Sequence, residues 1–493
     1  MEQSTRPAVA PTSAAAAEAG WLTRLRERVE RQRRQFEGRP PTPAAAYEFE
    51  REVRAALDEA GRAIVREAFQ GREPAEPCQA DPEVRYRGDR YRRNKRTPCE
   101  VATTFGPIAL SSFLYLNEHD GEPGLHPLHV RLGIVAGGAT ARLAERVARL
   151  AVDFSQAEVR RWLEAEHGLR WSNDRLRRVL RAFRRTAVAF RAEAQVERVL
   201  GWLTAAQASR GRHRPVLAAG RDGVMVPIRG HGYQEAAAAT VSVYDRRGKR
   251  LGTVYLGHMP EAHQRAMSDA LTGLLRAVLA SWPGPTPRLA YVTDKGQAAE
   301  EYYRRVLRPM ADPRHPGKRL TWEWVLDYFH VAGYVGKLRE ALFGAGGQHW
   351  AGRMRHWLKQ RRQGVANVLR SAVQHYHRRR LSRAVRAEFW KAYRYLRRHS
   401  RWMDYPRLRR QGLPIGSGVT EAACKTVFTQ RLKRSGMRWQ RESGQVIVDL
   451  RVLHLSGIWA EVVRRDLQAR PLPEPIRRVS YKPRTTRTLK KPA

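Results

Sequence analysis

The chain has 493 residues, 42% of them hydrophobic, which is enough for about two to four domains with buried cores. Lys and Arg total 92 against 48 Asp and Glu, so the formal net charge is +44. Such an excess repels itself in a compact state unless a polyanion is bound, and nucleic acid is therefore the expected partner. An Arg-rich composition bias and binding to a membrane surface are the alternatives.

The first residues and the cysteines indicate an intracellular protein. Residues 1–20 are mostly Ala, Pro, Ser and Thr and are expected to be a disordered tail without the features of a secretion signal. No apolar run approaches the roughly 20 residues of a membrane span, so no membrane partner is expected. The three cysteines, Cys78, Cys99 and Cys424, are too few and too widely spaced for a disulfide framework. We expect a cytoplasmic, nucleoid-associated protein of a prokaryote.

Residues 21–72 are expected to form a helical N-terminal segment. Apolar residues recur at helical spacing on both sides of a Pro-rich break at 40–43, beginning with Trp21 and Leu25 before the break and with Phe49 and Val53 after it. Packing or self-association is the expected role of these helices. The helical pattern of apolar residues then ends. Residues 73–135 are expected to form a small subdomain with strands at 100–105 and 108–116.

Several potential zinc ligands lie in this subdomain, namely Cys78, Cys99, His119, His126 and His129. A close Cys-x-x-Cys pair, which makes a zinc interpretation strong, is missing. We therefore predict that these are loop and surface residues.

Residues 136–205 contain helix-starting and helix-ending residues at the spacing of a helix-turn-helix unit. Ser155 and Glu158 form a capping-box pattern, Gly168 is placed to end the first helix, and Ser172 can cap the second. The second helix opens with polar and basic residues that could enter the major groove, Asn173, Arg175, Arg177 and Arg178. The alternative is an ordinary helical hairpin with a solvated charged face.

Strand and helix patterns alternate over residues 210–332. Three successive strands are expected, at 215–219 with 224–228, at 238–244 and at 250–256, the last two joined by a turn at 245–248. A helix at 262–282, a strand at 288–293, a helix at 298–307 and a strand at 321–329 follow. This order predicts an α/β core, a mixed sheet flanked by helices.

The chain then becomes helical and basic. Residues 333–412 are rich in Arg, Trp, His and Tyr at helical spacing and contain no convincing strand. A Gly-rich lead at 412–418 precedes a helix that carries Glu421, and residues 465–493 are expected to be a basic disordered tail on DNA.

Two aspartates in the core are candidate metal ligands. Asp222 lies within the first strand pair beside Gly223, and Asp294 ends the fourth strand. Clustered carboxylates can hold two divalent ions about 3.5–4 Å apart, which serve phosphodiester cleavage and strand transfer. Either residue taken alone is more typical of an ordinary turn aspartate.

The pair gains weight from four segments that occur in order. They are Asp-Gly at 222–223, VTDKG at 292–296, LDYFH at 326–330 and PIGSGVTEAACK at 414–425, followed by RLKRSGMRW at 431–439. Together they resemble the motif series of ISKra-type insertion-sequence transposases, which are related to Mutator-like transposases. The resemblance covers roughly residues 75–460, and its most specific part is 414–439.

The resemblance implies a DDE transposase with a ribonuclease-H-like core built from residues 210–332 and 413–460. Asp222, Asp294 and Glu421 would be the catalytic acids and would hold two Mg²⁺ or Mn²⁺ ions. Asp327 and His330 match an Asp-x-x-His element and would support the active site. Lys425, Arg431, Lys433 and Arg434 are expected to contact DNA, and the protein to act as a homo-oligomer on element ends and target, with no small-molecule substrate.

The chain departs from the pattern of the resembled family at one point, and two alternative functions remain open. Relatives carry a Cys-x-x-Cys pair in the region matching residues 115–127, and this chain has none there, which puts a family zinc site in doubt. A ribonuclease-H-like nuclease without strand transfer and a transposase-derived DNA-binding regulator are the alternative functions. If the triad is correct, residues 333–412 must form a helical insertion that returns Glu421 to the two aspartates.

Overall fold

The computed structural model describes residues 13–119, 121–294 and 296–476. The chain divides into two compact units, one of residues 1–147, 156–183 and 467–493, the other of residues 148–155 and 184–466. Among the described residues, no helix has the length and apolarity needed to cross a bilayer.

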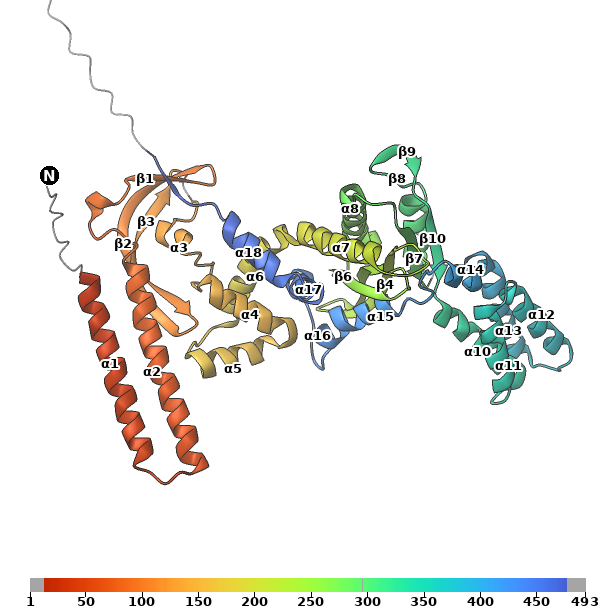
Figure 1. The fold of residues 1–493 in the computed structure, drawn as a ribbon, viewed down its shortest axis with the longest axis horizontal. Coiled ribbons are helices and arrows are strands. Elements are labelled where there is room, and N and C mark those ends of the chain that lie inside the picture. The colour runs from red at the N-terminus through yellow and green to blue at the C-terminus, as the bar shows by residue number, and fades with distance from the viewer. Residues whose placement is uncertain (1–12, 120, 295, 477–493) are drawn as a thin grey trace, which may run out of the picture. The chain divides into compact units, whose positions relative to one another are not determined.

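The first unit begins with a helical hairpin, α1 (Ser13–Glu37) and α2 (Pro43–Gln70) (Figure 1). The Thr42 side chain starts α2 by accepting a hydrogen bond from the Ala45 amide at 3.2 Å. The tail predicted at 1–20 is wrong from Ser13 onward, because the Ala-rich stretch there favours a helix. The rest of that tail lies outside the described residues.

A four-stranded antiparallel sheet follows in the same unit, in the order β11-β1-β2-β3. Its strands are β1 (Glu83–Tyr86), β2 (Asp89–Thr103), β3 (Gly106–Asn117) and β11 (Glu474–Pro475), and a short 3₁₀ turn, η1 (Pro77–Gln79), precedes them. The strands predicted at 100–105 and 108–116 are present. The C-terminal tail predicted from residue 465 is wrong as far as Pro475, because the backbone of β11 pairs with β1.

Three of the predicted loop residues of this subdomain are half-buried and in contact. The Sγ atom of Cys99 on β2 lies 3.1 Å from Nε2 of His129, which is carried by α3 (Pro127–Arg131), and the ring of His126 stacks on that of His129. Burial lowers the pKa of His129 to about 4. The surface prediction is wrong for these three residues, because α3 packs against β3; Cys78 and His119 are exposed, as predicted.

Four helices follow, α4 (Ala141–Asp153), α5 (Gln156–His167), α6 (Asn173–Ala189) and α7 (Arg191–Ala208). Gly168 ends α5 with a positive φ of 63°, and the Ser172 hydroxyl accepts a hydrogen bond from the Arg175 amide at 3.1 Å. The predicted helix, turn and helix are therefore present as α5 and α6.

A five-stranded mixed sheet forms the centre of the second unit, in the order β10-β7-β4-β5-β6 (Figure 1). Its strands are β4 (Val216–Ile228), β5 (Gly232–Tyr244), β6 (Arg250–His258), β7 (Arg288–Thr293) and β10 (Trp322–Leu326). β5 is antiparallel to both of its neighbours, whereas β4, β7 and β10 are parallel. This arrangement is compatible with a ribonuclease-H-like core.

Helices cover the sheet. On one face α7 and α8 (Arg265–Ser281) bury Leu203, Leu271 and Leu275 against β4, β5 and β6, joined by α9 (Gln297–Tyr302) and the π-helical turn η3 (Tyr303–Leu307). The β8–β9 hairpin (Ala311–Asp312 and His315–Arg319) precedes β10. The C-terminal helices are α15 (Gly418–Ala423), the π-helical turn η5 (Cys424–Thr429), α16 (Gln430–Leu432), α17 (Arg441–Leu455) and α18 (Trp459–Ala469).

The chain between β10 and α15 is helical, as predicted. Its elements are α10 (Tyr328–Phe343), α11 (Gln348–Gln360), α12 (Gly364–His377), α13 (Arg383–His399), the 3₁₀ turn η4 (Ser400–Trp402) and α14 (Tyr405–Arg410). The strand predicted at 321–329 ends earlier, at Leu326, because the Asp327 side chain caps α10. Trp350 and Phe389 are buried in the cluster that joins these helices to the sheet, so these two aromatics serve packing.

We predict that Gly257→Ala destabilises the second unit. A Cβ at Gly257 on β6 would lie 2.6 Å from a Val448 methyl and 3.0 Å from a Val427 methyl, both buried, so α17 and η5 would have to move. Overpacking of this kind costs about 1–3 kcal/mol, which thermal unfolding followed by circular dichroism can measure. Gly273→Ala on the exposed face of α8 is the control, where a Cβ meets nothing within 4 Å and helix propensity is expected to raise stability slightly. Equal effects of the two substitutions would contradict the close packing on β6.

Candidate active site

Strand register sets Asp222 level with Asp294. Gly220 of β4 pairs with Val292 of the parallel strand β7, and extending this register by two residues brings the two aspartates beside each other. Each carboxylate is held by a nearby backbone amide, Asp222 by Gly223 at 2.8 Å and Asp294 by Gly296 at 3.1 Å. Each of the two side chains is therefore held by a hydrogen bond within its own turn.

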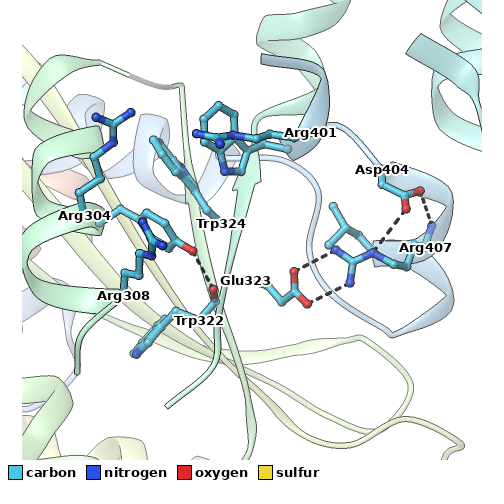
Figure 2. Close-up of a pocket in the computed structure, with 11 residues that line it drawn as sticks. Arg304, Arg308, Trp322, Glu323, Trp324, Arg401, Asp404 and Arg407 are labelled. Carbon is cyan, nitrogen blue, oxygen red and sulfur yellow. Dashed lines mark hydrogen bonds and ion pairs between the residues drawn. The ribbon is translucent and has the colours of Figure 1, made fainter. Parts of the chain in front are cut away.

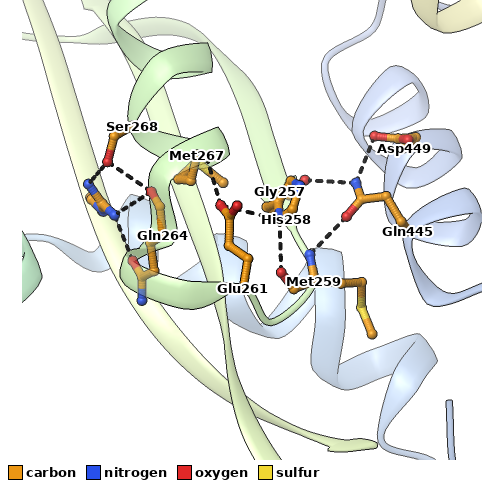
Figure 3. Close-up of polar contacts among 10 residues, drawn as sticks. Gly257, His258, Met259, Glu261, Gln264, Met267, Ser268, Gln445 and Asp449 are labelled. Atoms are coloured by element: carbon orange, nitrogen blue, oxygen red, sulfur yellow. Dashed lines mark hydrogen bonds and ion pairs between the residues drawn. The ribbon is translucent and has the colours of Figure 1, made fainter. Parts of the chain in front are cut away.

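Arg221 points to the sheet face opposite Asp222 and is almost fully buried there. Its guanidinium donates to Gln264 Oε1 at 2.7 Å and to Ser268 Oγ at 2.8 Å, and Figure 3 shows Gln264 and Ser268 close together at the start of α8. Gln264 has a φ of 47°, which is unusual for a residue other than glycine. Burial of Arg221 anchors β4 beneath Asp222.

The helix that carries Glu421 contacts β4 and β5 directly. Thr420 Oγ1 lies 2.9 Å from Thr240 Oγ1, and a Cβ at Gly220 would lie only 2.0 Å from Thr420 Oγ1. The Cys424 thiol, at the next turn, donates to Asp222 Oδ2 at 3.5 Å. Glu421 lies between these two contacts in the chain and is therefore held beside Asp222.

Asp327, at the end of β10, is fully buried and holds the segment that leads into α15. Its Oδ1 accepts from the amides of Phe329 at 2.5 Å and His330 at 3.2 Å, and its Oδ2 accepts from the Ser417 amide at 2.9 Å and from the Ser417 hydroxyl. Asp327 therefore holds the start of α10 and the lead into α15 together.

Ser417 also bridges Asp327 to Glu421, because its Oγ lies 2.7 Å from Glu421 Oε1. A hydroxyl has a single proton and can donate to only one of the two carboxylates. The Ser417 hydroxyl therefore links the carboxyl groups of Asp327 and Glu421.

The pKa values of the acids reflect this concentration of negative charge. Burial raises the pKa of Asp222, and the charges of Asp294 and Glu235 raise it further against the opposing effect of the Gly223 amide. For Glu421 the Ser417 hydroxyl lowers the pKa, but desolvation and the neighbouring Asp327 and Asp222 together raise it above the ordinary value. A nearby cation would relieve the repulsion.

Two residues near the acids carry no signal of their own in the sequence. Glu235 of β5 lies over Gly223, where a Cβ would come within 1.8 Å of its carboxylate. Burial and the charge of Asp222 raise the pKa of the Cys424 thiol, so Cys424 remains a protonated donor. Both roles were missed because a contact between two different elements leaves no pattern along the chain.

His330 is exposed and lies among tyrosines. Its ring centroid is 5.5 Å from that of Tyr334 and 5.9 Å from that of Tyr395, and these two tyrosines stack at 3.7 Å. The Tyr395 hydroxyl lies 3.5 Å from the Asp294 carbonyl oxygen. Helix α13 thus reaches the backbone of a candidate catalytic residue, and His330 is linked to the acids through these rings and through its amide, which donates to Asp327.

The candidate DNA-contact residues of α6 differ in whether their side chains are already bound to other residues of the protein. Asn173 and Arg178 are exposed, and Arg177 forms an ion pair with Asp174 at 3.1 Å. Arg175 donates to the Gly137 carbonyl oxygen at 2.9 Å and to Glu100 at 3.0 Å. The structure therefore gives Arg175 a role in holding α6 within its own unit.

The basic residues after Glu421 also differ in exposure and in their contacts within the protein. Arg431 is 1% exposed, donates to the Ala151 carbonyl oxygen at 3.2 Å and lies over the Trp439 ring, so the predicted DNA contact by Arg431 is corrected to a structural role. Arg434 is exposed but donates to the Asp153 carbonyl oxygen at 2.7 Å. Lys425 and Lys433 are exposed.

No preformed metal site is found among residues 13–119, 121–294 and 296–476: no three Asp, Glu, His or Cys side chains in these ranges form a group that could hold an ion. Glu421 accepts a hydrogen bond from the Ser417 hydroxyl at 2.7 Å. The donor set is nevertheless of the right chemistry, since carboxylate oxygens with raised pKa values suit a hard divalent cation.

Comparison with known proteins gives no family. No protein-family model matches the chain, and no curated protein matches it. The argument for function therefore rests on the residues of the candidate site.

We predict that Asp222→Asn stabilises the protein at neutral pH in the absence of divalent ions. Because folding raises the pKa of Asp222, the folded state binds the proton more tightly than the unfolded state, and stability falls as pH rises above the ordinary Asp pKa. The substituted side chain has no charge, so this loss of stability disappears. Its amide oxygen can still accept the hydrogen bond from the Gly223 amide. The thermal midpoint should exceed that of the wild type at pH 7, and the gap should close below about pH 4.

The control is Asp269→Asn on the exposed face of α8, which should change the midpoint little at either pH. A gap that persists unchanged in acid would contradict the assignment of the effect to the carboxylate charge.

Proposed function

We propose that the protein is a DNA transposase whose strand cleavage and joining use Asp222, Asp294 and Glu421. The observation that carries the proposal is the register of β4 and β7, which sets Asp222 level with Asp294, together with the contact of α15 at Gly220. Three acids from distant parts of the chain are thereby near enough for Asp294 to raise the pKa of Asp222 and for Asp222 to raise that of Glu421. The electrostatic repulsion between these carboxylates lowers the stability of the folded protein, and no packing interaction compensates for it.

A ribonuclease-H-like core is part of the proposal. The strand order β10-β7-β4-β5-β6, with only β5 running against its neighbours, supports it. The net charge of +44 supports DNA as the partner, because Lys and Arg contacts to phosphate supply most of the affinity for nucleic acid. We further propose that the protein acts on element ends and target as a homo-oligomer.

The chemistry of cleavage requires stabilisation of charge at phosphorus and an activated water or 3′ hydroxyl, which two Mg²⁺ or Mn²⁺ ions supply when bound. Asp222 and Asp294 would hold the ions from rigid strand positions. Glu421 would join them by turning from Ser417, a rotation that its exposed position allows. Asp327 would stay in place to anchor Ser417, and the Cys424 thiol would orient Asp222.

The decisive experiment is incubation of the full chain with the two ends of its own element and Mg²⁺ or Mn²⁺, followed by mapping of cut and joined strands. Cleavage with joining to a target supports the proposal. Cleavage without joining indicates a nuclease, and binding without cleavage indicates a DNA-binding regulator.

We predict that Ala at Asp222, Asp294 or Glu421 abolishes cleavage and joining while binding of element ends stays largely intact. Each carboxylate would hold metal, whereas affinity for DNA comes mainly from basic residues. Gel-shift and strand-mapping assays on the same preparations measure both properties. Asp269→Ala on α8 is the matched control and should cleave normally; a triad variant that still cleaves is not a catalytic residue.

We also predict that Arg178→Ala on α6 weakens binding to element ends by about 1–3 kcal/mol if Arg178 reads a base. Arg178 is exposed on the second helix of the helix-turn-helix pair, where a side chain can reach a groove. Fluorescence anisotropy with specific and random duplexes measures the difference.

The control is Arg161→Ala on the exposed face of α5, which removes the same charge from the first helix. Equal losses on specific and random DNA for Arg178→Ala would show that α6 binds phosphate only.

A further inference from the structure

Helix α13, one of the helices α10–α14 in Figure 1, presents a row of basic side chains to solvent. Its exposed basic residues are Arg383, Arg386, Lys391, Arg394, Arg397 and Arg398. Each lies three, four or eleven residues from Arg383 or Arg394, and these intervals return to the same side of a helix with 3.6 residues per turn. The six residues therefore share one side of α13, which we call the α13 basic face.

The opposite side of α13 is packed in the core. Phe389, Ala392 and Leu396 are buried in the cluster that joins the helices to the sheet. In the basic face, Arg386 and Arg394 each donate through Nε to a nearby backbone carbonyl of their own segment. The packing of α13 therefore does not depend on the charges of the basic face.

These charges are not neutralised within the described part of the protein. Other arginines of the chain are paired, as Arg26 is with Glu30 at 2.9 Å on the same helix. Arg407 of α14 is likewise paired with Glu323 at 2.9 Å (Figure 2). By contrast, no residue of the α13 basic face forms an ion pair within residues 13–119, 121–294 and 296–476. The face thus carries uncompensated positive charge along its whole length.

Helix electrostatics make this arrangement unfavourable in the absence of a partner. The helix dipole favours anions in the first turn, yet the first turn of α13 has no acid and carries Arg383 and Arg386 instead. Like charges three or four residues apart on a helix, such as Arg394 and Arg398, also repel each other. The dipole favours cations only in the last turn. A bound polyanion would remove the repulsion along the whole face.

The aromatic residues of α13 beside this face are packed into the protein. Trp390 and Tyr393 are half-buried and both contact the Phe389 ring, and the Trp390 indole donates to the Tyr376 hydroxyl at 3.3 Å. Single-stranded nucleic acid is bound largely by stacking of bases on aromatic rings, whereas the backbone of a duplex is bound by Lys and Arg contacts to phosphate. The composition of the face therefore favours a duplex backbone.

The length of the face also suits a duplex. From Arg383 to Arg398 it extends about 22 Å, at 1.5 Å per helical residue. One strand of a DNA duplex carries about six phosphates over that length, at 3.4 Å per nucleotide along the axis. Several of the six basic side chains can therefore contact the same DNA segment.

One end of the face lies near the candidate acids. Tyr395, whose hydroxyl lies 3.5 Å from the Asp294 carbonyl oxygen, is on the same helix. Arg394 and Arg398 are within one helical turn of Tyr395. A duplex that lies along the face would therefore have one end of its path beside Asp294.

We propose that the α13 basic face binds the phosphate backbone of double-stranded DNA irrespective of base sequence and holds a duplex that passes beside Asp294. Binding of the backbone needs only the charges of the face. The assignment of this duplex as the one that is cut or joined rests on the proposed transposase function.

The test measures binding of the full chain to a labelled random-sequence duplex by fluorescence anisotropy at several salt concentrations, with EDTA present so that no strand is cut. The variant combines Arg383→Gln, Lys391→Gln, Arg397→Gln and Arg398→Gln. Each phosphate contact contributes about 0.9 to the slope of log K against log salt, so the slope should become shallower by about two to four. Affinity at fixed salt should fall about tenfold or more. Unchanged affinity and slope would overturn the proposal.

The matched control removes the same charge from four exposed arginines that are each paired with an acid on their own helical segment, Arg26→Gln, Arg33→Gln, Arg304→Gln and Arg305→Gln. The control should bind nearly like the wild type. An equal loss in both combinations would show a general effect of net charge and overturn the site. The thermal midpoint of the α13 variant should equal or exceed that of the wild type, because repulsion is removed.

A substitution of opposite sign makes the test independent of any loss of folding. Glu388 is exposed on α13, three residues before Lys391, and its charge would repel a phosphate bound to the face. Glu388→Gln should strengthen duplex binding about twofold or more. The control is Glu27→Gln, an exposed residue of α1, which should change binding less. An equal effect of the two substitutions would contradict the location of the duplex on α13.

Other polyanions are separate outcomes of the same test. A loss confined to a labelled oligothymidylate, or to vesicles that contain phosphatidylserine, would overturn the proposal in favour of a single strand or a membrane surface. Because cleavage is not measured, weakened duplex binding supports the α13 basic face even if the acids prove not to be catalytic. Unchanged duplex binding would reject the face without bearing on the acids.

Discussion

The close approach of α15 to the sheet at Gly220 is the contact on which the candidate site depends. A side chain at this position would overlap the Thr420 hydroxyl, so glycine lets the helix lie directly on β4. The Thr240 and Thr420 hydroxyls then lock the contact by a hydrogen bond inside the protein. Glu421 and Cys424 follow Thr420 on the same helical segment, so this contact also brings them near Asp222.

Concentrated negative charge works against this arrangement. The protein carries a large positive charge elsewhere, yet no arginine or lysine forms an ion pair with Asp222, Asp294 or Glu421 among the described residues. The acids are instead held by amides, by a hydroxyl and by a thiol. A site that leaves its carboxylates without cationic partners keeps their charge for an external cation, at a cost in stability.

The sequence was sufficient for the five strands of the central sheet and for the helices between β10 and α15, because the periodicity of apolar residues and the positions of glycine are local properties. It did not predict β1, β8 or β9. The strand at Arg288–Thr293 was predicted to the residue. The sequence was not sufficient for the contact of Ser417 with Asp327, 90 positions away, or for that of Glu235 with Gly223 on the neighbouring strand. Arg431 shows the same limit: its position in a basic motif suggested DNA, but burial under Trp439 is a tertiary property.

The described parts of the two predicted tails were mispredicted for a related reason, whereas residues 1–12 and 477–493 lie outside the described residues. Composition alone indicated disorder at residues 13–20 and 465–475, whereas the structure has a helix in the first range and, in the second, the end of α18 and the strand β11. β11 is a strand only because β1 offers it an edge, and pairing across the chain cannot be read from Pro and Arg content.

The Asp327–Ser417 contact has a consequence for how the chain between them can change. The two residues are 90 positions apart, and their hydrogen bonds close the helices from α10 to α14 into a loop with fixed ends. The entropy of closing a flexible loop grows only with the logarithm of its length, by about 0.6 kcal/mol for each doubling. A change in the length of this segment therefore alters the closure entropy little, and the cost of changing its helices comes instead from core contacts such as those of Trp350 and Phe389. One buried carboxylate thus fixes both ends of the segment, whereas its interior is held by apolar packing.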